Sequence, residues 1–152
     1  MNRILLKIIG FIEVFGGLWG ISIMLYRMAD VLDNFRVLFY MLLYLLPFIL
    51  SLIAGILLLQ KKRSGIDLSL AVQALQIPYF AVAGWYYSFI SGVLLGVRVS
   101  FFEKATHYSF NFLTGGYCQI QNGLPEGISA FGINIFAIIL LIILVRQKNS
   151  KN

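Results

Sequence analysis

The chain is poor in the residues that usually carry chemistry. Its 152 residues include one cysteine, one histidine and six acidic side chains. A single cysteine excludes an intrachain disulfide and a Cys-x-x-Cys redox pair. His107 has no cysteine or histidine neighbour at zinc-site spacing, and no serine lies in a motif that would pair it with a base. We therefore expect no metal site, no cofactor and no enzymatic activity.

Charged residues are also scarce, at 12% of the chain, whereas hydrophobic residues make up 60%. A soluble domain of this length would have too little polar surface to cover such an apolar mass. The apolar residues form four long runs, at 4–26, 37–59, 66–86 and 128–145. As α-helices these runs would be roughly 27 to 34 Å long, close to the ~30 Å hydrocarbon thickness of a bilayer. Since they lack polar alternation, helices are favoured over barrel strands.

The predicted fold is thus an all-α integral membrane protein, a four-transmembrane-helix bundle that forms one domain over 1–152. The first run has Arg3 just before it and Lys7 near its start, as in a secretory signal peptide, but it is longer than the apolar part of such a peptide. We expect it to be a permanent span. The third run stays apolar as far as residue 96, so its helix projects, tilts or bends near Pro78, and a bend is favoured.

Basic residues predict the orientation of this bundle. One group lies at the start of the first run, between the second and third runs, and after the fourth: Arg3, Lys7, Lys61, Lys62, Arg63, Arg146, Lys148 and Lys151. The other connections hold Arg27, Arg36, Arg98 and Lys104. The positive-inside rule then places both termini in the cytoplasm and segments 27–36 and 97–127 outside the plasma (inner) membrane. The net charge of +6 would face anionic lipid headgroups, and no nucleic-acid-binding signature accompanies it.

Segment 97–127 has a different pattern from the four runs. Apolar and polar residues alternate at 97–101, at 108–112 and at 118–120, which predicts three short strands. A glycine turn at 113–117 would join the second strand to the third, and 103–106 would link the first to the second. We expect a small β-rich extracytoplasmic insert between the third and fourth helices, since three strands are about the minimum for a stable meander.

Each predicted span carries a polar residue at a similar depth. Counted by helix rise from the cytoplasmic end, Glu13 lies at roughly 14 Å, Ser51 at ~13 Å, Gln76 at ~15 Å and Asn134 at ~17 Å. An ionised carboxylate at that depth costs several kcal/mol unless it is paired. The favoured interpretation is a polar cluster that fixes helix register. Proton or small-solute handling and a pocket for a lipid or hydrophobic ligand are the alternatives.

Small residues accompany Glu13 in the first run. Gly10, Gly17 and Gly20 share its helical stripe, and Gly16 and Gly20 have the spacing typical of close helix approach. This stripe predicts tight helix packing, either within the chain or in a homo-oligomer. The function that these features favour is a binding, assembly or accessory membrane subunit, whose partners are the bilayer and a second copy or another membrane protein. The alternative is a small transporter or channel that uses Glu13 as a protonatable group.

Overall fold

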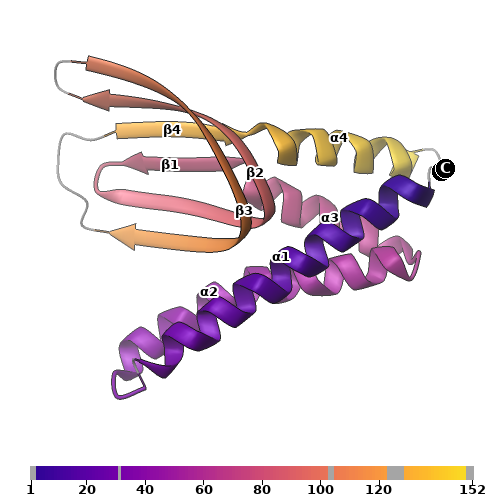
Figure 1. Ribbon diagram of the computed structural model, residues 1–152, viewed down its shortest axis with the longest axis horizontal. Coiled ribbons are helices and arrows are strands. Elements are labelled where there is room, and N and C mark those ends of the chain that lie inside the picture. The colour runs from indigo at the N-terminus through magenta and orange to yellow at the C-terminus, as the bar shows by residue number, and fades with distance from the viewer. Residues whose placement is uncertain (1–2, 31, 103–104, 123–128, 150–152) are drawn as a thin grey trace.

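The computed structural model describes residues 3–30, 32–102, 105–122 and 129–149. Two long helices, α1 (Arg3–Ala29) and α2 (Phe35–Leu59), form a hairpin that extends along the molecule (Figure 1). A shorter helix, α3 (Arg63–Gln76), leads into the sheet, and α4 (Ile135–Asn149) leads out of it. The strands between them are β1 (Pro78–Val82), β2 (Trp85–Phe102), β3 (Ala105–Asn122) and β4 (Ser129–Asn134).

The prediction of an all-α four-transmembrane-helix bundle is wrong. Within the described residues, α1 and α2 are the helices long and apolar enough to cross a membrane. The apolar run 66–86 leaves the helical conformation after Gln76 and becomes β1, while the run 128–145 begins as β4. Pro78 cannot donate the main-chain hydrogen bond that would continue α3, and the aromatic and β-branched residues that follow it suit a strand. With 14 and 15 residues, α3 and α4 are only about 21 to 23 Å long.

The β-structure is also larger than the predicted insert at 97–127. The segment 113–117 is not a turn between two strands but a bend inside β3. Gly115 (φ 118°) pairs with Gly92 (φ 109°) of β2, so the two long strands bend at the same level. Glycine adopts this backbone conformation without the steric cost that a side chain would bring. Of the predicted link at 103–106, residues 103 and 104 lie outside the described residues.

The bend lets the antiparallel sheet curl upon itself. The first residues of β2 pair with β1, and its last residues pair with β4. Because β1 also pairs with β4, these pairings form a closed circuit. β3 follows β2 along its whole length, so the two halves of β3 lie at the two edges of the curled sheet. One face of the sheet therefore points inward and the other outward.

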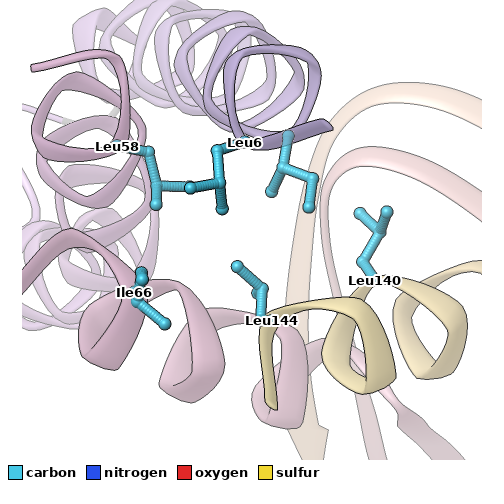
Figure 2. Packing of buried hydrophobic residues seen from close by; sticks show 6 residues of the cluster. Leu6, Leu58, Ile66, Leu140 and Leu144 are labelled. Carbon is cyan, nitrogen blue, oxygen red and sulfur yellow. The ribbon is translucent and has the colours of Figure 1, made fainter. Parts of the chain in front are cut away.

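The four helices meet at the end of the molecule away from the sheet, where α1 begins and α4 ends (Figure 1). Side chains from all four helices pack together there, and Figure 2 shows this cluster with Leu6, Leu58, Ile66, Leu140 and Leu144 labelled. A second cluster joins α1 and α2 to the bend of the sheet. In it the rings of Phe48 and Phe89 lie 5.4 Å apart in an edge-to-face arrangement.

Candidate functional site

The predicted glycine stripe packs α1 against two neighbours within one chain. Gly10 and Gly17 face the main chain of α2, and Gly20 faces the ring of Phe48. Gly16 lies against the sheet, where a Cβ atom would come within 2.1 Å of the main-chain nitrogen of Gly92. The absence of side chains thus brings both α2 and the bend of β2 close to the α1 backbone.

Glu13 of α1 is fully buried where this helix contacts α2 and α3. Two side chains of α3 donate hydrogen bonds to its carboxyl group, Ser69 Oγ to Oε2 at 2.6 Å and Gln73 Nε2 to Oε1 at 2.9 Å. Ser51 of α2 donates to the Glu13 main-chain oxygen at 3.1 Å. Each carboxyl oxygen therefore has a protein donor, which is what a buried carboxyl group requires.

The same hydrogen-bonded series continues into the sheet. Ser91 Oγ of β2 donates to Ser51 Oγ at 2.7 Å, and the Ser91 N–H donates to Gln76 Oε1 at 2.8 Å. We call this series the Glu13 cluster, consisting of Glu13, Ser51, Ser69, Gln73, Gln76 and Ser91. Gln76 Nε2 is buried and has no hydrogen-bond partner. The cluster thus ties α1, α2 and α3 to the bend of the sheet.

Asn134 lies apart from this cluster. Its Nδ2 donates to the Val93 main-chain oxygen at 3.2 Å, and its Oδ1 accepts from the Leu95 N–H at 3.2 Å. The same Oδ1 accepts from the first free N–H groups of α4, so Asn134 caps that helix. The structure therefore brings together Glu13, Ser51 and Gln76, and uses Asn134 elsewhere.

Sequence reasoning missed Ser69, Gln73 and Ser91. Ser69, Gln73 and Gln76 recur at i, i+4 and i+7, so a polar stripe on α3 was available as a signal. Ser91 gave no such signal, because its position depends on the bend at Gly92. Within the described ranges, no group of three or more His, Cys, Asp or Glu side chains could hold a metal ion.

A second candidate site is a cavity of about 440 Å³ inside the curled sheet, which we call the sheet cavity. Its polar lining consists of Tyr79, Tyr86, Ser88, Arg98, Asn111 and Tyr117. Its apolar lining consists of Ile90, Leu94, Phe110, Phe112 and Leu113. The prediction of a polar layer in a helix bundle did not include this cavity, because it is formed by the inward face of strands.

Strand register explains how two polar groups converge in the sheet cavity. Tyr79, Gly132 and Arg98 form one row across β1, β4 and β2, so their side-chain positions share a face. Gly132 leaves room for the Tyr79 ring, since a Cβ atom there would lie 2.0 Å from Tyr79 Cζ. The hydroxyl reaches β2, where it lies 3.0 Å from the position that a Cβ atom of Gly96 would take.

Two polar atoms at this point lack a hydrogen-bond partner of normal distance and angle. Tyr79 is only 7% exposed, and neither its Oη nor the buried Nε of Arg98 has a hydrogen-bond partner. Burial raises the pKa of Tyr79, while hydrogen bonding to the Asn111 side chain and the charge of Arg98 lower it. The Asn111 side chain is thus close to the Tyr79 hydroxyl but does not meet it with normal hydrogen-bond distance and angle. The phenol therefore stays neutral at physiological pH and has a proton to donate. No acidic side chain is among the lining residues of the sheet cavity.

Two further cavities, of about 450 and 580 Å³, lie where α2 faces β3, with α1 contributing to the lining of the first and β2 to that of the second. Tyr40, Tyr44 and Cys118 line both of them. The Tyr44 hydroxyl donates to the main-chain oxygen of Ile120, which fixes α2 against the edge of the sheet. Burial raises the pKa of the Cys118 thiol to about 11. This thiol is consequently a packing group rather than a reactive one.

Comparison with known proteins brings no further identification: no family model, curated protein or solved structure matches the chain.

Proposed function

We propose that this protein is a membrane-embedded binding subunit that holds a small ligand in its sheet cavity. The observation that carries the proposal is the pair of buried, unpartnered polar atoms, Tyr79 Oη and Arg98 Nε. Leaving a buried polar group without a partner costs about 1 to 3 kcal/mol, and a ligand with acceptor atoms would remove this cost. The cavity volume of about 440 Å³ lies within the range of small-molecule sites.

The two long helices support the placement in a membrane. With 27 and 25 residues, α1 and α2 are about 40 and 38 Å long, enough to cross the hydrocarbon layer. Lys61 and Lys62 connect α2 to α3, whose first residue is Arg63, and this connection lies at the end of the molecule where α1 begins and α4 ends (Figure 1). By the positive-inside rule we place the protein in the plasma membrane, with this end and both termini in the cytoplasm.

The outward face of the sheet supports contact with lipid rather than with water. Seven large apolar side chains are exposed on it: Leu95, Phe101, Tyr108, Phe110, Phe112, Phe131 and Ile133. A contiguous apolar surface of this kind is rare on a soluble protein and marks a site of interaction. The sheet starts after the 14 residues of α3, roughly 21 Å from the cytoplasmic end. We therefore place it beside the outer half of the α1–α2 hairpin, in the outer leaflet.

The Glu13 cluster has a structural role in this proposal. Both carboxyl oxygens of Glu13 already accept hydrogen bonds from α3. Glu13 lines none of the three cavities described above. These contacts favour a subunit that binds or assembles over a transporter that uses Glu13 as a proton carrier.

The test is to fill the sheet cavity and measure what the protein retains. Wild-type protein purified in a mild detergent should carry a non-protein mass in native mass spectrometry. Ser88→Leu adds a side chain from a buried position of the cavity wall and should abolish this mass. Ser129→Leu makes the same change on the outward face of β4 and should preserve it. Absence of the mass from the wild type, or its retention by a folded Ser88→Leu variant, would refute the proposal.

A further inference from the structure

The lining of the sheet cavity indicates the chemical class of its ligand. Resting on the proposed function, we propose that the ligand is an anionic phospholipid of the bilayer. Its phosphate would be bound by Arg98 and Tyr79, and its acyl chains would leave the cavity past Phe110 and Phe112.

Arg98 determines the charge of the ligand. It is the one charged residue in the cavity lining, and among the described residues it takes part in no ion pair. A half-buried guanidinium next to a neutral ligand would remain without a counter-charge, and a cationic ligand would be repelled. Phosphate oxygens match the planar fork of guanidinium donors and accept two hydrogen bonds at once.

Tyr79 supplies a second donor at a fixed position. Its ring is held over Gly132, and its hydroxyl lies over Gly96 on the same face of the sheet as Arg98. The hydroxyl is buried and has no partner of normal hydrogen-bond distance and angle, so an oxyanion between Tyr79 and Arg98 would accept from both. Since both groups are already held by the sheet, binding would require little ordering of side chains.

The opening of the cavity determines the apolar part of the ligand. By strand register, Phe110 and Phe112 belong to the outward face, opposite Val97 and Leu95. They nevertheless line the cavity, and they are 83% and 72% exposed. Since β3 is the edge of the curled sheet, the cavity opens past this edge onto the apolar outer surface. A phospholipid would place its headgroup in the polar interior of the cavity and its acyl chains on the apolar outer surface of the sheet, whereas a free anion would occupy the polar interior alone.

The experiment measures thermal unfolding of the purified full-length protein in a neutral detergent with three additives. Phosphatidylglycerol should raise the melting temperature by several degrees, whereas phosphatidylcholine and inorganic phosphate at the same concentration should have little effect. Arg98→Gln should weaken the apparent affinity for phosphatidylglycerol by about tenfold or more, since it removes a charge-assisted contact. Tyr79→Phe keeps the ring over Gly132 and should cause a smaller loss of the same kind. Arg36→Gln, at an exposed position in the first turn of α2, is the matched control and should bind like the wild type.

Four results would overturn the inference. Equal protection by inorganic phosphate would identify a free anion as the ligand. Equal losses in Arg98→Gln and Arg36→Gln would indicate unspecific attraction to the charged surface. Unchanged binding by Arg98→Gln would show that the headgroup lies elsewhere. If phosphatidylglycerol fails while Ser88→Leu still removes a retained mass, the cavity binds another ligand, so this inference fails and the proposed function stands.

Discussion

Replacing Glu13 by leucine should destabilise the protein more than any single loss of a surface charge. The substitution keeps an apolar shape of similar size but removes both acceptors of the carboxyl group. Ser69 Oγ and Gln73 Nε2 would then be buried donors without partners. Each stranded donor costs about 1 to 3 kcal/mol, so the free energy of unfolding should fall by roughly 2 to 6 kcal/mol. Glu13→Gln retains one carbonyl acceptor and should lose about half of this amount.

The assay is denaturant unfolding in detergent, followed by far-ultraviolet circular dichroism. Asp67→Asn is the matched control, because it breaks the 2.7 Å ion pair with Lys148 at a position where both side chains are more than half exposed. Exposed ion pairs of this kind contribute less than about 1 kcal/mol. In the double variant Ser69→Ala with Glu13→Leu, the loss should be smaller than the sum of the single losses, because one stranded donor has been removed.

Unfolding of Glu13→Leu at the denaturant concentration of the wild type would refute a structural role of Glu13. A Glu13→Gln variant that is as stable as the wild type but abolishes a proton-linked flux in liposomes would refute it in a second way. That second outcome would restore the transporter alternative. A stable variant without any flux defect would mean that the two donors, Ser69 and Gln73, find other partners when the carboxyl group is lost.

Two further predictions concern the packing of the sheet against the helices. Gly16→Ala should lower the free energy of unfolding by about 1 to 3 kcal/mol or more, because its Cβ would meet the backbone of Gly92 rather than a flexible side chain. Ser22→Ala, on the exposed side of α1, is the control and should change this free energy little. Equal melting temperatures for the two variants would contradict the observed packing. Cys118 should react slowly with N-ethylmaleimide at pH 7.5, because its thiol is buried and only 6% exposed, and the rate should increase after unfolding in dodecyl sulfate. Labelling of the folded protein as fast as that of free cysteine would exclude the buried position.

The first two apolar runs could be predicted well, because an uninterrupted apolar stretch of more than 20 residues has few alternatives to a long helix. The predicted ranges 4–26 and 37–59 lie inside α1 and α2. The third and fourth runs could not be predicted, since each is apolar throughout but changes from one backbone geometry to the other. Hydrophobicity specifies what a segment is buried against, and it does not distinguish a buried strand from a buried helix.

The candidate site was predictable to the extent that it depends on single helices. Glu13 is the one acidic residue in the first run, and any apolar environment makes such a residue conspicuous. The sheet cavity depends instead on register across three strands, which places Tyr79, Gly132 and Arg98 in one row. That register follows from where β2 bends and which strands lie beside each half, and neither is visible in the local pattern of residues.

The recurrence of polar residues at one depth has a structural cause that a depth estimate from helix rise does not reveal. Between its pairing with β1, which ends at Tyr87, and its pairing with β4, which begins at Gly96, β2 has β3 as its one strand partner. Its main-chain groups on the other side would be buried without partners, at a cost of about 1 to 3 kcal/mol each. Gln76 accepts from the Ser91 N–H in this gap, and Asn134 bonds to Val93 and Leu95. Two of the four polar residues predicted at one level thus serve the unpaired side of a bent strand, which explains why they lie where α3 ends and α4 begins.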